Sequence, residues 1–244
     1  VWMGEILFRT KLSENLFKGL SPWLSKLPGG LVHVNVVGCA LFAAISGSSA
    51  ATVATVGKMS IPELRKRKYP EKLLLGSLAG SGTLGLLIPP SIILIIYGVT
   101  IEDSIAKLFM AGILPGIMLA VMFMLYVIFW SILNKKLMPK STKNFSFAEK
   151  VQGSKQLLPV IFLITGVIGS IYTGIATATE AASLGVVGAL ILSFFQGTLS
   201  KETFNLSLLG ATKTSCMIAF IIAGSTFLSL AMGFTGLPRN LAIW

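Results

Sequence analysis

Small polar residues and paired prolines interrupt two apolar stretches of the chain, and these residues have the types that could bind a ligand. The first interruption is Ser46-Gly47-Ser48-Ser49, between the apolar runs 31–45 and 50–61. The second lies in GSGTLGLLIPPSIILIIYG, residues 80–98, where glycine, serine and threonine precede Pro89 and Pro90. Proline removes a backbone donor and clashes with a carbonyl one turn earlier, so a helix over 73–99 is expected to break near 82–90.

A helix broken in this way has unpaired backbone atoms at both new ends. Carbonyl oxygens at the end of the first half, 73–81, can coordinate Na⁺, and N–H groups at the start of the second half, 91–99, attract an anion. Nearby hydroxyls and glycines add ligands and close backbone approach, and Ser91 is suited to cap the second half. The alternative is a proline kink healed by neighbouring helices. The candidate substrate- and ion-binding residues are Ser46, Gly47, Ser48, Ser49, Ser81, Gly82, Thr83, Gly85, Pro89, Pro90 and Ser91, with Ser46, Ser49, Ser81 and Thr83 as candidate Na⁺ ligands.

The composition places these interruptions in a membrane. Of 244 residues, 54% are hydrophobic and 12% are charged, and the mean hydropathy is +0.83. The apolar windows 73–99 and 108–133 both exceed the roughly 20 residues that cross a bilayer. Further apolar runs cover 157–172, 181–195 and 215–234. The sequence therefore predicts an all-α integral membrane protein.

The positive charge of the chain follows its loops. The net charge is +11, and basic residues gather in 65–72, in 134–143 and in the amino-terminal stretch. Such clusters in short loops are typical of the cytoplasmic side of a membrane protein. Their alternation with poorly charged loops gives a consistent topology, so the charge indicates a lipid bilayer and not nucleic acid as the partner.

The two runs around Ser46–Ser49 are short for membrane spans. Each has about 15 residues, or about 22 Å as a helix. Lys26 precedes the pair and Arg65 follows it, so both ends belong to the cytoplasmic face and 31–64 is predicted to be a re-entrant hairpin. The alternative is a pair of full spans packed through small residues. The remaining divisions are an amphipathic cytoplasmic-side lead-in at 1–30, a cytoplasmic connector at 134–155 and three further spans within 157–244.

Enzymatic chemistry has little support in this chain. It has one histidine and contains neither HExxH nor GxSxG, and no pair of aspartates lies within its apolar runs. An intramembrane protease would need such groups. Cys39 and Cys216 lie in apolar runs, so we expect them to be small core residues without a disulfide.

Two charged residues lie at the edges of late apolar runs. Glu180 fits the first turn of a helix that begins at Thr177 or Thr179, although an acidic residue near membrane depth is also a functional candidate. Lys213 is expected at the start of its helix, from which it can extend to the cytoplasmic face.

The segments PGGLVHVNVVGCALFAAISGSSAATVATVGKMSIPEL (28–64) and AGSGTLGLLIPPSIILIIYGVTIEDSIAKLFMAGILPG (79–116) resemble the large membrane subunit of tripartite ATP-independent periplasmic (TRAP) transporters. GIATATEAASLGVVGALI (174–191) resembles a later segment of that family. The resemblance runs over nearly the whole chain. It implies an elevator-type fold in which two opposed hairpins, each followed by a broken helix, enclose the substrate and its sodium ions. Ser46–Ser49 would form the first hairpin tip, and Ser81–Pro90 would contribute the facing break.

The resemblance also implies a function and partners. The family imports C4-dicarboxylates, sialic acid or similar organic acids through the bacterial inner membrane, with Na⁺ as the coupling ion and no other cofactor. Its partners are a small four-helix membrane subunit and a periplasmic solute-binding protein. The alternatives are a stand-alone elevator-type anion:Na⁺ symporter and a non-transporting scaffold. No second IPP occurs in the chain, so we expect a fragment that carries about half of the transport site.

Overall fold

The protein is described by a computed structural model that covers residues 1–10, 12–139, 145–155, 157–236, 240 and 243. Within these residues all regular secondary structure is helical. The helices are α1 (Trp2–Phe8), α2 (Leu12–Leu24), α3 (His33–Ser46), α4 (Ser49–Lys66), α5 (Glu71–Gly82), α6 (Ile92–Thr100), α7 (Ile105–Leu133), α8 (Phe147–Ser154), α9 (Leu158–Tyr172), α10 (Ala178–Phe195) and α11 (Lys201–Thr235). Short 3₁₀ turns cover η1 (Gly30–Val32), η2 (Thr83–Leu86) and η3 (Lys135–Leu137).

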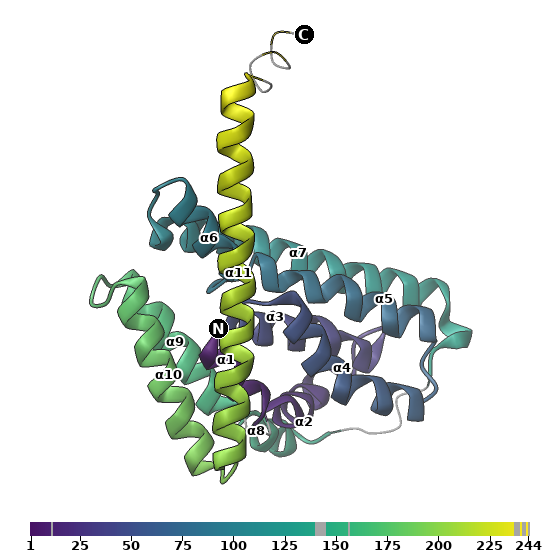
Figure 1. Cartoon of the computed structure of the whole chain (residues 1–244). Helices are drawn as coiled ribbons and strands as arrows, with labels where there is room; N and C mark the ends of the chain where they lie inside the picture. Colours follow the sequence, from purple (N-terminus) through teal and green to yellow (C-terminus); the bar gives the residue numbers. More distant parts are fainter. Residues whose placement is uncertain (11, 140–144, 156, 237–239, 241–242, 244) are drawn as a thin grey trace.

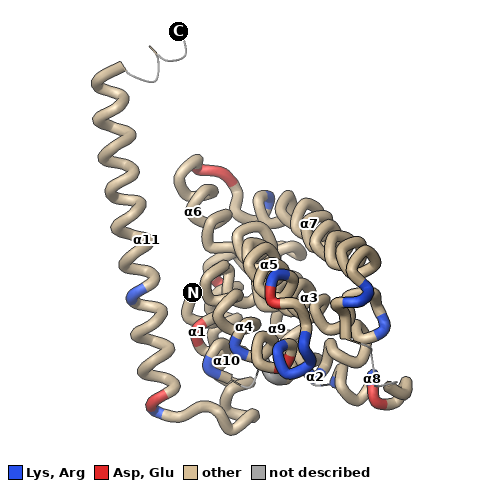
Figure 2. The backbone as a smooth tube through the Cα atoms, turned by 90° about the vertical axis from the view of Figure 1, so that its right-hand side faces the viewer, with Lys and Arg blue, Asp and Glu red and all other residues tan. Residues whose placement is uncertain are grey.

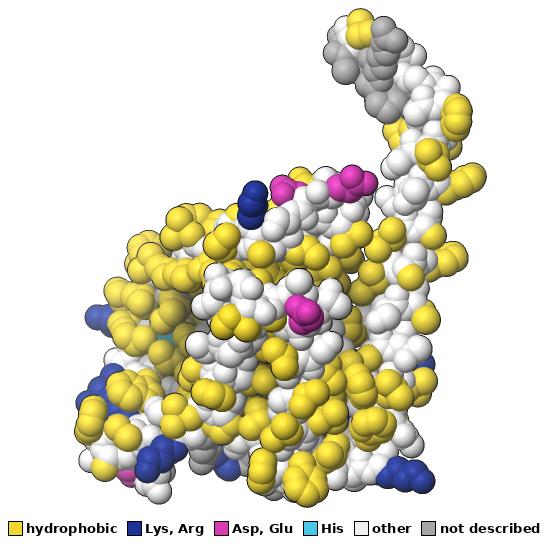
Figure 3. All heavy atoms as spheres, turned by 90° about the vertical axis from the view of Figure 1, so that its left-hand side faces the viewer, with side chains coloured by type: hydrophobic (Ala, Val, Ile, Leu, Met, Phe, Trp, Pro, Cys, Tyr) yellow, Lys and Arg dark blue, Asp and Glu magenta, His cyan; other side chains and the backbone are white. Residues whose placement is uncertain are grey.

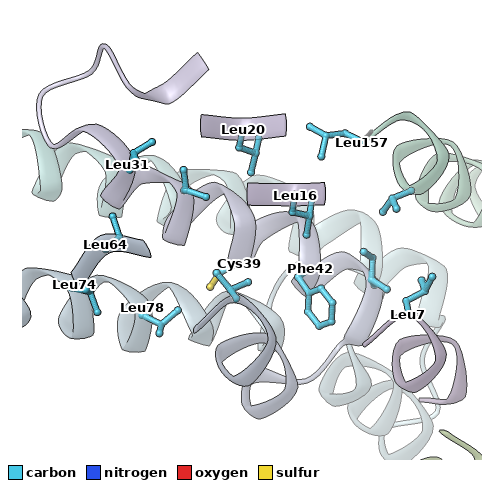
Figure 4. Packing of buried hydrophobic residues seen from close by; sticks show 14 of the residues in the cluster. Leu7, Leu16, Leu20, Leu31, Cys39, Phe42, Leu64, Leu74, Leu78 and Leu157 are labelled. Carbon is cyan, nitrogen blue, oxygen red and sulfur yellow. The ribbon is translucent and has the colours of Figure 1, made fainter. Parts of the chain in front are cut away.

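Helix α3 lies at the centre of the fold, and eleven of its residues are buried. It packs against α4 and α5, and α2 and α1 cover its other sides (Figure 1). Figure 4 shows the apolar side chains that meet there, with Phe42 and Cys39 from α3 next to Leu16 from α2 and Leu78 from α5. Close packing of these side chains holds α3 in place, since van der Waals contact is a main source of helix association within a membrane.

The longer helices surround this core. Helix α7 runs beside α5, and α9 and α10 form an antiparallel pair (Figure 1). Helix α11 has 35 residues, packs mainly on α1, and projects beyond the rest of the molecule (Figure 1). Among the described residues, α7, α10 and α11 are long and apolar enough to cross a membrane. The prediction of an all-helical, multi-pass membrane protein is therefore confirmed.

The surface agrees with this conclusion. Figure 3 shows hydrophobic side chains over most of one face, with charged side chains mainly towards its upper and lower margins. In Figure 2, lysine and arginine gather in the turn between α4 and α5 and after the end of α7, whereas the loop between α6 and α7 carries acidic residues. These acidic residues are Glu102 and Asp103, in the turn before α7. The charge asymmetry is the one expected of a membrane protein whose basic end faces the cytoplasm.

Two expectations about α11 are wrong. Lys213 does not start its helix, because α11 begins twelve residues earlier, at Lys201. The polar residues at 201–205 lie outside the apolar run 215–234 but form the first turn and a half of the helix. Cys216 is not a core residue, because it lies on the exposed part of α11, whereas Cys39 is buried; both cysteines are free. The exposure of Cys216 follows from the contact of α11, which reaches α1 but not the core.

Candidate functional site

The turn between α3 and α4 consists of Gly47 and Ser48. Gly47 ends α3 in the left-handed conformation, with φ of 59°, and its N–H donates to the Ala43 carbonyl at 2.9 Å. Ser48 is the N-cap of α4, and its Oγ accepts from the Ala51 N–H at 3.4 Å. The glycine therefore allows the chain to reverse within two residues, and the serine satisfies a donor at the new helix start.

Hydroxyl groups surround the Ser48 carbonyl at this tip. Ser46 Oγ lies 3.2 Å from Ser48 O and 3.0 Å from Thr52 Oγ1, and Thr52 Oγ1 donates to Ser48 O at 2.7 Å. The Ser48 N–H donates back to Ser46 Oγ at 3.3 Å. Ser49 differs, because its buried Oγ has no hydrogen-bond partner among the described residues. A buried hydroxyl without a partner costs about 1–3 kcal/mol, so it marks a position where a ligand would be stabilising.

The helix over 73–99 is interrupted. Helix α5 ends at Gly82, η2 follows, and α6 begins at Ile92 after Ser91 as N-cap. The peptide bond between Pro89 and Pro90 is cis. Ser91 occupies the N-cap position, but its Oγ donates to the Leu86 carbonyl at 2.7 Å and makes no cap hydrogen bond to α6. The hydroxyl thus satisfies a carbonyl left over from η2, which differs from the capping role expected for it.

The tip and the break touch each other through backbone atoms. A Cβ atom on Gly85 would lie 2.9 Å from Ser49 N and 3.0 Å from Ser48 C. A Cβ atom on Gly47 would lie 2.8 Å from Pro90 O. All three distances are below the 3.4 Å at which ordinary contact begins, so glycine is needed at each of the two positions for this approach. A Cβ on Gly82 would likewise collide with Val53 of α4.

One hydrogen bond joins the two interruptions. The Ile92 N–H, at the start of α6, donates to the Gly47 carbonyl at 3.4 Å. The first repeating bond of α6 runs from the Ile95 N–H to the Ser91 carbonyl at 3.1 Å, so the Ile93 and Leu94 N–H groups precede it and have no partner within the helix. The positive end of α6 therefore lies beside the hairpin tip, with N–H groups to offer to an anion.

Two of the candidate Na⁺ ligands point elsewhere in this structure. Ser81 is fully buried. Its Oγ donates to the Ser77 carbonyl of the same helix at 2.5 Å and lies 3.4 Å from the Asn35 carbonyl of α3. Thr83 is exposed, and its Oγ1 donates to Gly80 O at 2.7 Å. Each of these two hydroxyl oxygens donates its proton but keeps its lone pairs, which are the part of the group that binds a cation. The structure thus brings together Ser46–Ser49 with Gly82, Gly85 and Pro90, and holds the Ser81 and Thr83 hydroxyls on the sides of α5 and η2.

Two polar residues near the site were missed in the sequence. Asn35 is fully buried; its amide donates to Leu74 O at 3.2 Å and to Ser77 Oγ at 3.0 Å, and its Oδ1 has no partner among the described residues. Thr52 holds the tip, as described above. An amide within the apolar run HVNVVGCALF was a usable signal, because a polar side chain at membrane depth requires a partner or a function.

The first helix also reaches the tip. A Cβ atom on Gly4 of α1 would lie 2.9 Å from Ser46 Cα, so the amino-terminal segment packs directly on the hairpin. Between α1, α6, α9 and α10 lies a cavity of about 120 Å³, whose wall includes Ser46, Pro90 and Ile92. The other side chains around it are apolar. The segment 1–30, expected only as a lead-in, thus supports the tip in this structure.

Glu180 takes part in a helix cap. Thr177 Oγ1 accepts from the Glu180 N–H at 3.3 Å, and the Thr177 N–H donates to Glu180 Oε2 at 2.8 Å. The helix therefore begins after Thr177, and the two residues form a reciprocal capping box. The start of α10 lies near the tip, because Ala178 and Ala182 line the cavity that Ser46 and Pro90 also line.

Known proteins resemble this chain over its whole length. The family model described as "Tripartite ATP-independent periplasmic transporter, DctM component" matches residues 1–244. The C4-dicarboxylate TRAP transporter large permease protein DctM of Pseudomonas aeruginosa is 35% identical, over 99% of this chain and 56% of the relative. The sialic acid TRAP transporter large permease protein SiaM of Vibrio cholerae is 31% identical, over 99% and 56%. The ectoine TRAP transporter large permease protein TeaC of Halomonas elongata is 31% identical, over 98% and 55%. The chain spans about half the length of these curated relatives.

Proposed function

The chain belongs to the family of the DctM component of tripartite ATP-independent periplasmic transporters, and on that premise we propose that the whole protein carries an organic acid across the bacterial inner membrane together with Na⁺. The observation that carries this proposal is the backbone contact between the Ser46–Ser49 tip and the break at 82–91. It places carbonyl oxygens, an unpartnered hydroxyl and the start of α6 in one place. Such groups suit a cation and an acid group bound side by side.

The two ligands would use different parts of the contact. Na⁺ prefers oxygen ligands, which Ser46 and Ser49 offer as hydroxyls and the tip offers as carbonyls; Ser81 and Thr83 would have to turn their hydroxyls towards the tip to join them. A substrate carboxylate would take the N–H groups at the start of α6. In this proposal the bound Na⁺ supplies positive charge next to the carboxylate, so each ligand improves the affinity for the other.

The transported acid is proposed only as a class. Relatives that are 31–35% identical to this chain are named for C4-dicarboxylate and for sialic acid, so identity at this level does not separate these acids. The partners in the proposal are a small four-helix membrane subunit and a periplasmic solute-binding protein. The fold proposed for the whole protein is the elevator type, in which 31–64 forms the re-entrant hairpin and the second hairpin comes from outside this chain.

The test is uptake by the full-length protein reconstituted in liposomes with its membrane partner and binding protein. We expect uptake of the acid only with an inward Na⁺ gradient, and none with K⁺ in its place. Uptake that continues without Na⁺ contradicts the coupling. Uptake that needs Na⁺ but not the binding protein would replace the tripartite system with a stand-alone symporter.

The break is tested by the double change Pro89→Ala and Pro90→Ala, which favours a continuous helix without placing a side chain against Val53 of α4. We expect normal membrane insertion and no Na⁺-dependent uptake. The matched control is Pro62→Ala, a change of a proline inside α4 that is thirteen residues from Ser49. If the double variant transports normally, the break is only a kink.

A further inference from the structure

A second feature lies far from the tip, at the basic end of the molecule. A cavity of about 870 Å³, open to the surface, lies between the loop that joins α2 to α3 and the end of α7. The residues of its wall that matter here are Lys26, Gly29, Gly30, Tyr69, Ser131 and Lys135. Figure 2 shows basic residues following the end of α7.

The loop that forms one wall is held close to its neighbours. Gly29 and Gly30 both have left-handed backbone, with φ of 99° and 52°. A Cβ atom on Gly30 would lie 2.5 Å from Tyr69 Oη, and one on Gly29 would lie 3.0 Å from Ser131 Oγ. The Leu31 N–H donates to Tyr69 Oη at 3.1 Å. The loop, Tyr69 and α7 therefore form one packed unit.

The wall of this cavity offers donors and positive charge. Lys26 and Lys135 are exposed, so their ammonium groups are free to turn towards a ligand. Tyr69 Oη accepts the Leu31 N–H, which leaves its own proton for another acceptor, and burial raises the pKa of this hydroxyl, so it stays protonated near neutral pH. Ser131 is 3% exposed, and its Oγ has no partner among the described residues. Of the described residues that form this wall, none is a carboxylate. Hydroxyl and ammonium donors without a competing acid suit a phosphate group.

The position of the cavity indicates where the phosphate comes from. Ser131 and Ile132 lie in the last turn of α7, a helix long enough to span the membrane, and Lys135 follows directly. Trp130 lies at the same level, as aromatic residues do at membrane interfaces. The neighbouring Leu133 is 67% exposed, so apolar surface continues from the cavity along α7. The cavity thus lies at headgroup depth, beside a surface that acyl chains can cover.

We propose that this cavity binds the phosphate headgroup of an anionic membrane lipid, with Lys26 and Lys135 contributing charge and Tyr69 and Ser131 contributing hydrogen bonds. Basic pockets between helices on the cytoplasmic side of a membrane recognise such headgroups. The bound lipid would tie the α2–α3 loop to the end of α7. The site is independent of the transported substrate, because it lies at the opposite end of α3 from the hairpin tip.

The experiment is native mass spectrometry of the purified full-length protein with phosphatidylglycerol or with phosphatidylcholine of the same chain length. The test variant is Lys26→Gln with Lys135→Gln. The control is Lys201→Gln with Lys213→Gln, which removes the same charge from α11. Each lysine next to an anionic headgroup contributes roughly fivefold to affinity, so we expect the test variant to bind phosphatidylglycerol about 25-fold more weakly. The wild type and the control should both prefer phosphatidylglycerol over phosphatidylcholine.

Three results would overturn this inference. The first is equal phosphatidylglycerol binding by the wild type and the test variant. The second is an equal loss in the test and control variants, which would mean that only the net charge matters. The third is displacement of the lipid by an excess of inorganic phosphate, which would assign the cavity to a free anion. The single change Lys135→Gln should weaken phosphatidylglycerol binding about fivefold, and it tests the same inference if the double variant cannot be purified.

Discussion

Replacing Gly85 by alanine tests the contact between tip and break most directly. The new Cβ would lie 2.9 Å from Ser49 N, 3.0 Å from Ser48 C and 3.2 Å from Ser48 O, all of them backbone atoms. Since ordinary contact begins at 3.4 Å, the tip must move away by about 0.5 Å. A backbone cannot rotate out of the way as a side chain can, so the added methyl should cost about 1–3 kcal/mol.

The assay is thermal unfolding of the full-length protein in detergent, in Na⁺ and in K⁺. A ligand that binds only the native state raises the melting temperature according to its concentration and affinity. We expect Gly85→Ala to melt lower in K⁺ and to lose most of the additional stability in Na⁺. A loss of about 1.4 kcal/mol in ion binding would lower the apparent Na⁺ affinity tenfold.

The matched control for this change is Gly76→Ala in α5, where an added Cβ meets nothing within 4 Å. Alanine is the better helix former, so this variant should be as stable as the wild type or slightly more so, with its Na⁺ response unchanged. The reasoning is refuted if Gly85→Ala keeps the full Na⁺ response, because the tip and the break would then not share the ion.

Three further substitutions separate ligand binding from stability. Ser49→Ala removes a hydroxyl without a partner, so stability in K⁺ should stay level or rise by about 1 kcal/mol, while the Na⁺ stabilisation shrinks; an undiminished Na⁺ response removes Ser49 from the ion site. Asn35→Ala removes two donated bonds and should destabilise the protein by about 1–3 kcal/mol in either salt, and a neutral effect in thermal unfolding would contradict its structural role. Thr177→Val removes the cap of α10 and should cost about 1 kcal/mol with uptake retained, whereas loss of uptake at normal stability would give the Thr177–Glu180 pair a role in transport.

Local features of this fold were predictable because they follow from local chemistry. Two adjacent prolines remove two backbone donors in succession, so the Pro89-Pro90 pair was enough to predict an interruption near 82–90. The single prolines Pro22, Pro62 and Pro115, by contrast, lie inside α2, α4 and α7. The small polar residues at 46–49 similarly indicate a turn, because glycine permits the left-handed conformation that the structure has at Gly47. The capping box at Thr177 and Glu180 is also local, since its two partners are three residues apart.

Features that depend on distant packing were not predictable in this way. Nothing near Gly4 in the sequence indicates that it will contact Ser46, which is 42 positions away. The start of α11 was missed because hydropathy detects only the apolar part of a helix, and KETFN at 201–205 is polar although it is helical. The hydroxyl of Ser91 had two possible partners, an N–H of α6 or a carbonyl of η2, and only the folded geometry selects Leu86 O.

The hydrogen bond between Ile92 and Gly47 suggests how the binding of the two proposed ligands is linked. In this structure the Gly47 carbonyl accepts one N–H at the start of α6, at the long distance of 3.4 Å. A substrate carboxylate at that helix start would compete for this N–H, since a charged acceptor binds it more strongly than a neutral carbonyl. The released Gly47 carbonyl would then need a new partner, and Na⁺ is one. The two ligands proposed for the site would therefore favour each other through one shared backbone bond, which is a physical basis for coupled transport.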